Sequence, residues 1–188
     1  GYSGLSKLAL YAIGGILKHA KAISAIANPS TNSYKRLVPG FEAPVSIAYA
    51  TANRSAVIRI PGYTITADEK RFELRSPDAT ANPYLAYSAI MMAAFDGILH
   101  KIDPEKAGYG PYDCNLFDLS EKEQKKIDSL PTSLYEASNE LEKDYKFLLA
   151  GGVFTENIIK NHIKRIREDF LKVNKMPHPI EFEMYYNL

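Results

Sequence analysis

Arginine side chains in the first half of the chain carry the strongest chemical signal in the sequence. A guanidinium group binds carboxylate or phosphate oxygens through paired hydrogen bonds, and a carboxylate among such groups could hold a divalent cation that bridges phosphates. Together these residue types indicate phosphoryl transfer that involves a carboxylate substrate. The candidates are Arg36, Arg54, Arg59, Arg71 and Arg75, with Glu42 and Glu73 as the carboxylates.

A structural interpretation of the same charges stays open. Because side chains alternate along a strand, the run 71–75 places Arg71, Glu73 and Arg75 on one face and apolar residues on the other. On spacing alone, such a face is more often a solvated ladder of ion pairs, each worth little. Glu42, a single acid in a loop that contains proline and glycine, is more often an ordinary exposed carboxylate.

Several common catalytic motifs are absent from the sequence. It has no Gly-x-x-x-x-Gly-Lys-Ser/Thr phosphate loop, no Gly-x-Gly-x-x-Gly fingerprint and no Gly-x-Ser-x-Gly nucleophile elbow. The 13 tyrosines do not alternate with the arginines as a base-stacking platform would. The histidines lack metal-ligand spacing, and we expect all of them to be structural or solvent-facing: His19, His100, His162 and His178.

Composition is that of a soluble protein of about one domain. Hydrophobic residues make up 46% and charged residues 24% of 188 residues, and the formal net charge is +1, so neither nucleic acid nor a membrane is an expected partner. A single cysteine, Cys114, excludes an internal disulfide and favours a reducing, cytoplasmic compartment. Since Gly1, not Met, precedes a helical pattern directly, we expect the chain to be part of a longer polypeptide.

The elements that must position the arginines follow from periodicity and capping residues. An amphipathic helix runs from Leu5, with Ser3 as its expected N-cap, to Asn28. Residues 28–44 then predict a long, functional loop because they have three prolines and no usable period. Two short strands at 45–50 and 55–60 are expected to form a hairpin through 51–54, and 71–75 predicts a third strand.

The sequence pattern of residues 82–188 predicts a mainly helical region. Asn82-Pro83 is a typical helix start, with an apolar face that reaches Leu99, and Ser133–Glu136 is a capping box. Gly151-Gly152 is expected to end that second helix, and a third begins near Thr155. The final residues are unusually apolar for a chain end.

The segment 28–44 resembles the corresponding loop of bacterial type I glutamine synthetases. Further motifs follow at the spacing of that family, namely Asn53-Arg-Ser55, Ile58-Arg-Ile-Pro61, Arg71-Phe-Glu-Leu-Arg75, Asp78-Ala-Thr-Ala-Asn-Pro-Tyr84 and His178-Pro-Ile-Glu-Phe-Glu-Met-Tyr-Tyr186. The resemblance covers essentially all 188 residues. It implies an α/β fold, with residues 1–188 as the C-terminal portion of the catalytic domain: the later part of an antiparallel-strand α/β barrel followed by helices.

The resemblance also implies a reaction, in which L-glutamate and ATP form γ-glutamyl phosphate and ammonium displaces the phosphate to give glutamine. Arg36 and Arg75 would hold the carboxylates of the substrate. Glu42, on the flap 28–44, would cover glutamate and help to take a proton from ammonium, and Arg54 would stabilise the transferring phosphoryl group.

Nucleotide and metal contacts complete the set that the resemblance implies. Arg54, Arg59 and Arg71 would contact ATP, and Glu73 would ligate Mg²⁺ or Mn²⁺. The other metal ligands of the family would precede Gly1, so we expect the chain alone to be inactive. The resemblance further implies a homo-oligomer, a double hexameric ring in which the C-terminal tail of each subunit inserts into a facing subunit.

Two departures from the family pattern stand out. Phe117 occupies the position of a regulatory tyrosine that is adenylylated in many bacterial members, so we expect this enzyme to escape that control. The stretch 61–70 lacks the usual lysine placement, and Lys70 is a possible substitute.

Two rival functions stay open. One is a sister γ-glutamyl ligase that uses an amine or polyamine, and the other is a non-catalytic relative. The presence of Arg36, Glu42, Arg54 and Arg75 favours the ammonia-using enzyme.

Overall fold

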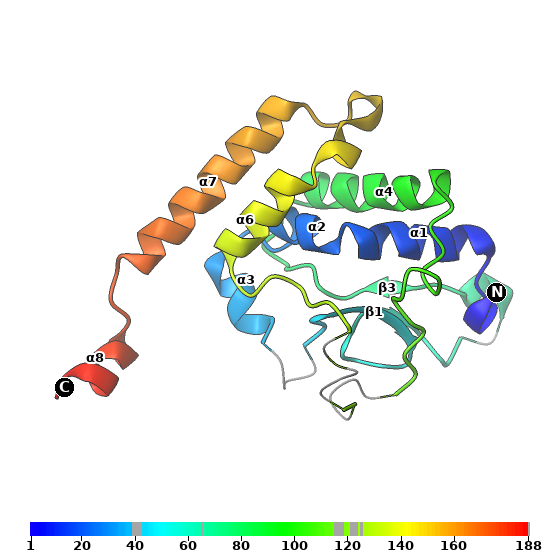
Figure 1. Cartoon of the computed structure of the whole chain (residues 1–188), viewed down its shortest axis with the longest axis horizontal. Helices are drawn as coiled ribbons and strands as arrows, with labels where there is room; N and C mark the ends of the chain where they lie inside the picture. The colour runs from blue at the N-terminus through cyan, green and yellow to red at the C-terminus, as the bar shows by residue number, and fades with distance from the viewer. Residues whose placement is uncertain (39–42, 65, 115–118, 121–123, 125, 188) are drawn as a thin grey trace.

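A layer of helices lies over a small sheet in the computed structural model (Figure 1), which describes residues 1–38, 43–64, 66–114, 119–120, 124 and 126–187. The helices are α1 Lys7–Lys18, α2 Ala20–Ala27, α3 Thr31–Arg36, α4 Pro83–Leu99, α6 Leu134–Lys143, α7 Glu156–Asn174 and α8 Pro179–Tyr185. The strands are β1 Ser46–Thr51, β2 Ala56–Ile60 and β3 Glu73–Leu74. Short 3-10 helices are η1 Tyr2–Gly4, η2 Ala67–Glu69 and η4 Lys146–Gly152.

The first predicted helix is divided into α1 and α2 by a bend at His19, which ends one and begins the other. Ser6 is the N-cap, since its hydroxyl accepts a hydrogen bond from the N–H of Ala9 at 3.1 Å. The expectation that Ser3 caps the helix is wrong. Ser3 lies inside η1 with φ of +50°, outside the extended conformation that an N-cap residue adopts.

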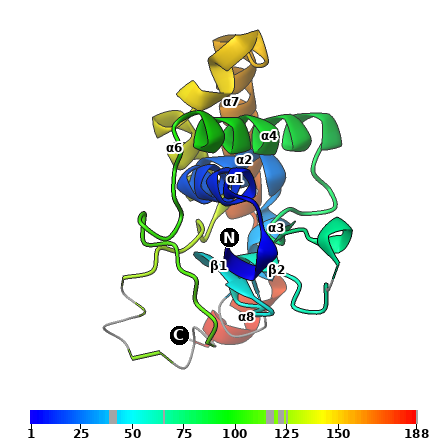
Figure 2. The same cartoon turned by 90° about the vertical axis from the view of Figure 1, so that its right-hand side faces the viewer.

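Two glycines allow the backbones of α1 and α4 to touch, with α4 stacked on α1 when the molecule is viewed along α1 (Figure 2). A Cβ atom at Gly15 would lie 2.1 Å from the carbonyl oxygen of Ala93, and one at Gly97 would lie 2.2 Å from that of Tyr11. Both obstacles are backbone atoms, which cannot rotate away. Glycine is unfavourable inside helices, so here close packing outweighs helix propensity.

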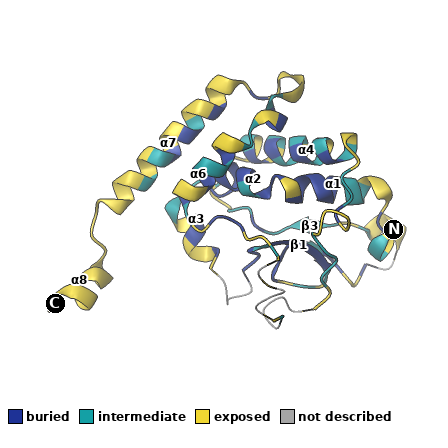
Figure 3. Cartoon of the chain, in the orientation of Figure 1, coloured by how far each residue is buried: buried dark blue, intermediate teal, exposed yellow. Residues whose placement is uncertain are grey.

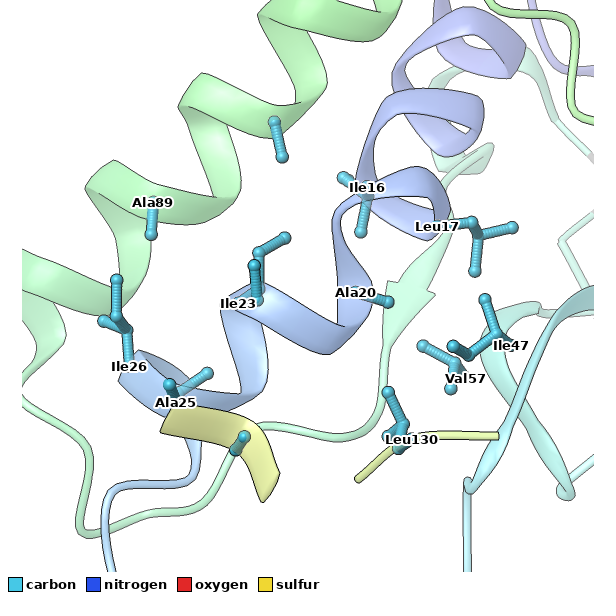
Figure 4. Close-up of a cluster of buried hydrophobic side chains, with 14 of the residues drawn as sticks. Ile16, Leu17, Ala20, Ile23, Ala25, Ile26, Ile47, Val57, Ala89 and Leu130 are labelled. Atoms are coloured by element: carbon cyan, nitrogen blue, oxygen red, sulfur yellow. The ribbon is translucent and has the colours of Figure 1, made fainter. Parts of the chain in front are cut away.

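The main core lies between the α1–α2 layer and the sheet. Leu17 of α1 faces Ile47 of β1 and Val57 of β2, with Leu130 beside them (Figure 4). All four side chains are at most 6% exposed. Their burial fixes which face of the sheet the helices cover, and leaves the strand ends and the following loops for polar residues.

The predicted loop at 28–44 is partly wrong, because it contains α3. Ser30 caps this helix: its hydroxyl accepts from the N–H of Ser33, and the Ser33 hydroxyl accepts from the N–H of Ser30. A serine pair is a weaker sequence signal than the usual Ser-x-x-Glu box, and three nearby prolines suggested an irregular path. Residues 39–42, and with them Glu42, lie outside the described part of the chain.

The expected hairpin is also wrong, because β1 and β2 pair in parallel with Ser46 opposite Ala56 and Thr51 opposite Ile60. Residues 52–55 must therefore return along the length of β1. Parallel strands usually need a crossover of roughly a dozen residues. Five Cα steps span at most about 18 Å, little more than the roughly 17 Å length of a six-residue strand, so this connection has almost no slack.

The third strand is shorter than the predicted 71–75 and comprises Glu73 and Leu74. It pairs antiparallel to β2, with Arg59 opposite Glu73 and Ile58 opposite Leu74. The free edge of β1 is covered by loop backbone, since Tyr49 exchanges hydrogen bonds with Tyr109 and Tyr112. The result is a small mixed sheet with several helices, which confirms the expected α/β class.

The helix starts predicted in the second half are largely confirmed. The Asn82 side chain accepts from two N–H groups at the start of α4, and Thr155 caps α7. Ser133 caps α6, because its hydroxyl accepts from the N–H of Glu136. The Glu136 carboxylate accepts from the N–H of Thr132 and not from that of Ser133, so the return contact of the predicted capping box is shifted by one residue. Gly151-Gly152 end η4, because α6 already stops at Lys143.

The buried face of α4 differs from the prediction. It is a stripe of small residues towards α1 and α2, while Leu99 is 77% exposed. The members of the stripe are Ala86, Ala89, Ala93 and Gly97.

The C-terminal end projects away from the rest of the molecule. Most of α7 beyond Ile166 and all of α8 are exposed (Figure 3). The tail bears apolar side chains that are at least 51% exposed: Ile180, Phe182, Met184, Tyr185 and Tyr186. No helix within the described residues is long and apolar enough to cross a membrane.

His19 ties the helix layer together at the bend. It is 2% exposed, and its ring nitrogens lie 2.7 Å from an oxygen of Asp144 and 2.9 Å from one of Asp96. The ring stacks on Phe147 at 3.9 Å between centroids. The expectation that this histidine is structural is confirmed.

Substitution of Gly15 by alanine should destabilise the protein strongly. The new Cβ would collide with the backbone of α4, and overpacking of this kind typically costs about 1–3 kcal/mol or more. Gly62→Ala is the control, since its Cβ would meet only side-chain carbons at 3.5 Å or beyond. Thermal unfolding should show a clear loss for the first variant and almost none for the second. Equal melting temperatures would contradict the close contact.

The contribution of Asp96 to stability should disappear in acid. Burial alone raises the pKa of Asp96, but hydrogen bonds from His19 and Lys18 outweigh it, so this pKa lies below its ordinary value. The unfolded chain then binds more protons in the interval between the two pKa values. The stabilisation is therefore complete above about pH 4 and is lost as pH falls through the folded pKa.

Urea unfolding of Asp96→Asn and the wild type at pH 7 and pH 3 tests this dependence. The advantage of the wild type should shrink at the lower pH. For the control variant Asp169→Asn, an exposed site on α7, the difference from the wild type should be small at both values. A wild-type advantage over Asp96→Asn that does not change with pH would refute the assignment.

Candidate functional site

Glu73 lies between two of the predicted arginines at the edge of the sheet. Its carboxylate is 3.2 Å from Nε of Arg59, directly opposite on β2, and 3.8 Å from Nε of Arg71. The Glu73 side chain is 33% exposed, so it stays reachable from solvent. This edge of the sheet therefore brings together the predicted metal ligand and two of the three predicted nucleotide-binding arginines.

Tyr63 holds Arg71 from the other side. The Arg71 guanidinium donates to the Tyr63 hydroxyl at 2.6 Å and lies over its ring at 5.4 Å from the centroid. Sequence reasoning did not single out Tyr63, although it lies within the unusual 61–70 stretch. Lys70, from the same stretch, donates to the carbonyl of Thr64 at 2.7 Å, and its nucleotide role stays a prediction.

Arg75 and Arg54 are joined directly. The Arg75 guanidinium donates to the backbone carbonyl of Arg54, and the backbone N–H of Arg75 donates to the carbonyl of Val57 on β2 at 3.0 Å. Arg75 is thus attached to the sheet through its own backbone and to the β1–β2 connection through its side chain. Arg54 itself is exposed.

Arg36 reaches the same region from the last turn of α3. Its Nη2 donates to the carbonyls of Ser76 and Pro77, the residues that follow Arg75, and lies 3.5 Å from Oδ1 of Asn28. Helix α3 therefore positions Arg36 beside Arg75, so that the two predicted carboxylate-binding arginines lie close together.

Asp78 adds a negative charge next to Arg36. The backbone N–H of Thr80, which donates to Asp78 at 2.8 Å, is the main reason that the pKa of Asp78 lies below its ordinary value. The Ser33 hydroxyl and the charge of Arg36 act in the same direction, against the effect of burial. The hydrogen bonds of this turn therefore favour the ionised form of Asp78, and its carboxylate serves the local structure.

The predicted residues form one region in two groups. Arg36, Arg75 and Arg54 follow one another through backbone carbonyls, while Arg59, Glu73 and Arg71 make a line of ion pairs across β2 and β3. Glu42 and Phe117 lie outside the described residues. Chemically, a row of guanidinium groups with one accessible carboxylate can bind carboxylate and phosphate groups.

A divalent metal fits this region only in part. Mg²⁺ takes oxygen ligands and is often held by one or two carboxylates together with phosphates of the substrate. Glu73 can supply one such ligand. Within the described ranges, however, no group of three or more His, Cys, Asp or Glu side chains could hold a metal ion.

Replacement of Glu73 by glutamine should cost little stability. Partly exposed ion pairs contribute about 0–1 kcal/mol, so the loss of two should lower the free energy of unfolding by less than about 2 kcal/mol. Urea unfolding measures this value, with Glu142→Gln as a matched control that removes the exposed ion pair of Arg167. A much larger loss for Glu73→Gln than for the control would show that the charges serve the fold and would favour the structural interpretation.

Known proteins match the chain along its whole length. The model of the glutamine synthetase catalytic domain matches residues 1–185. Glutamine synthetases of Aquifex aeolicus and Escherichia coli strain K12 are each 54% identical over 187 residues, and that of Haemophilus influenzae is 55% identical over 185 residues. These matches cover 98–100% of this chain but 38–39% of each relative, so the chain spans about two fifths of their length.

Solved structures agree in fold. A GmaS complex with ADP has a TM-score of 0.81 at 31% identity and covers 100% of this chain and 41% of the other. A Plasmodium falciparum glutamine synthetase determined by cryo-electron microscopy has a TM-score of 0.80 at 33% identity, covering 97% and 42%. With the motifs, the site and these matches taken together, the chain belongs to the glutamine synthetase family.

Proposed function

We propose that the protein which contains this chain is a glutamine synthetase, an ATP-dependent ligase that joins ammonium to L-glutamate through γ-glutamyl phosphate. The observation that carries the proposal is the contact between the Arg75 guanidinium and the backbone of Arg54. The contact supports the proposal because Arg75, the residue proposed to bind a carboxylate, touches Arg54, the residue proposed to stabilise the phosphoryl group, and transfer of phosphate to a carboxylate needs both groups close together.

Arg36 and Arg75 bind glutamate in this proposal. Both lie on the segment 75–77 or contact it, so their guanidinium groups can share one small dicarboxylate. Glu42, on the flap 28–44, covers the substrate, excludes water from the acyl phosphate and takes a proton from ammonium. Both this flap and the division of the chain into strands 45–75 and a helical part 82–188 belong to the proposal.

Arg54, Arg59 and Arg71 contact the phosphates of ATP, and Glu73 is one ligand of Mg²⁺ or Mn²⁺. The bound metal would neutralise phosphate charge during transfer. Arg59 and Arg71 already contact the Glu73 carboxylate and orient it towards the same surface. Because the described residues contain no group of three or more His, Cys, Asp or Glu side chains that could hold a metal ion, the remaining ligands in this proposal lie outside those residues.

The exposed tail suggests assembly. We propose a homo-oligomer, a double hexameric ring, in which α8 inserts its apolar side chains into a facing subunit. Exposed apolar patches of this kind typically mark interfaces. The exposed thiol of Cys114 suits a reducing compartment, so we place the enzyme in the cytoplasm.

Release of ADP by the full-length protein tests the function. With glutamate, ATP and Mg²⁺, we expect release that depends strictly on ammonium, and none from residues 1–188 alone. Activity only with an organic amine or polyamine would move the assignment to a sister γ-glutamyl ligase. No release of ADP with any acceptor would favour a non-catalytic relative. Release of ADP by residues 1–188 alone would refute the proposal that this chain holds an incomplete site.

Arg54→Ala should reduce kcat by about 10²–10³-fold, the usual effect of removing a group that stabilises transition-state charge. Arg165→Ala, an exposed arginine on α7, is the matched control and should leave kcat unchanged. An Arg54→Ala enzyme with wild-type kcat would exclude the proposed role of this side chain.

A further inference from the structure

Asn53, the residue before Arg54, uses its whole hydrogen-bonding capacity. Its Oδ1 accepts from the N–H and the hydroxyl of Ser55 at 2.9 and 2.7 Å. Its Nδ2 donates to the backbone carbonyls of Tyr112 at 3.0 Å and Cys114 at 2.5 Å. A primary amide has two N–H donors and one oxygen with two lone pairs, so no capacity is left over.

These contacts fix the peptide unit between Arg54 and Ser55 at both ends. The N–H of Ser55 is held by Asn53, and the carbonyl of Arg54 accepts from the Arg75 guanidinium. A planar peptide held at both its donor and its acceptor cannot rotate freely. The direction in which the Arg54 side chain leaves the backbone is therefore set by Asn53 on one side and by Arg75 on the other.

The backbone of Ala52 has a strained conformation that the neighbouring hydrogen bonds maintain. Its φ of +58° is a conformation that residues other than glycine rarely adopt. On one flank, the N–H of Thr51 donates to Oδ1 of Asp113 at 2.9 Å, and on the other, Asn53 bonds to the carbonyls on either side of Asp113. Such strain persists where surrounding contacts over-determine it, and it clusters at functional sites.

The segment that holds Asn53 is itself anchored to the sheet. The N–H of Tyr49 on β1 donates to the carbonyl of Tyr109 at 3.0 Å, and the N–H of Tyr112 donates to the carbonyl of Tyr49 at 3.1 Å. Residues 112–114 therefore form a fixed support beside β1, against which the short β1–β2 connection is bonded.

We propose that Asn53 is a positioning residue that fixes Arg54 relative to Arg75, so that the guanidinium group of Arg54 is aligned for phosphoryl transfer before the substrates bind. The proposal rests on the glutamine synthetase function put forward above. Asn53 acts through Arg54, since preorganised charge needs no rearrangement during the reaction, and a displacement of about 1 Å can cost on the order of 10²-fold in rate.

Two variants of the full-length enzyme separate the contacts. Asn53→Ala removes all of them. Asn53→Asp keeps the shape and the acceptor for Ser55, but it loses both donors to the 112–114 support and turns an oxygen towards two carbonyls. Asn157→Ala, at an exposed asparagine on α7, is the matched control. Steady-state kinetics and melting temperatures are measured for all three variants and the wild type.

Both Asn53 variants should lower kcat by about tenfold or more. KM for glutamate should stay within about threefold, because Arg36 keeps its contact with the carbonyl of Ser76 and the backbone N–H of Arg75 stays bonded to Val57. The Asn157 variant should match the wild type. A kcat within about twofold of the wild type in both Asn53 variants would overturn the proposal. Parallel losses in kcat, glutamate KM and melting temperature would also overturn it, since they indicate a merely structural role.

Amide hydrogen exchange distinguishes failure of this proposal from failure of the proposed function. In Asn53→Ala, the Ser55 N–H should exchange about tenfold faster or more, whereas the N–H of Leu17 in α1 should be unchanged. A wild-type enzyme without activity would refute the proposed glutamine synthetase function. Faster exchange of the Ser55 N–H in Asn53→Ala would still support the proposal that Asn53 fixes Arg54. An unchanged exchange rate of the Ser55 N–H in Asn53→Ala would refute the proposal that Asn53 fixes Arg54, even if the wild-type enzyme is active.

Discussion

The parallel pairing of β1 and β2 across a four-residue connection is the constraint on which the site depends. Because the chain has to return along β1 with almost no slack, Arg54 is held in a taut segment and not in a mobile turn. The antiparallel pairing of β3 with the other edge of β2 sets Arg59 opposite Glu73, and the Arg75 guanidinium, just after β3, donates to the Arg54 carbonyl in the β1–β2 connection. The two pairings of β2 together therefore bring the β1–β2 connection, Arg59, Glu73 and Arg75 to one region of the sheet.

The helix layer supports the sheet by two kinds of interaction that depend on each other. Gly15 and Gly97 let α1 and α4 approach until their backbones touch, and the buried His19 then lies close enough to bond Asp96 on α4 and Asp144 after α6. Apolar side chains such as Leu17 fill the space below. A larger residue at either glycine would push the two helices apart, and the hydrogen bonds of His19 at the bend would then be stretched or broken.

Local signals in the sequence predicted what local energetics decide, and failed where distant contacts decide. Asn82 and Thr155 cap their helices as expected because an N-cap needs only its own next turn. The hairpin prediction failed because strand pairing is set by the whole sheet. The face of α4 was misjudged because apolar residues surround this helix, so periodicity identifies no single stripe. The candidate arginines were selected by residue type and family motif, whereas the contacts of Tyr63 with Arg71 and of Asn53 with the 112–114 segment join residues far apart in the sequence or in loops, which no spacing reveals.

The partners of the arginines explain why the region suits anionic substrates. Arg36, Arg71 and Arg75 each donate to a backbone carbonyl, and Arg71 also donates to a tyrosine hydroxyl, so neutral acceptors help to fix these guanidinium groups. Ion pairs with acids would hold the same side chains in place but would cancel the field that a substrate must meet. In the arginine row, the carboxylate of Glu73 makes such pairs, and its single charge is shared by two arginines. A neutral acceptor adds no negative charge to the arginine row, so contacts of this kind are compatible with the binding of carboxylate and phosphate oxygens.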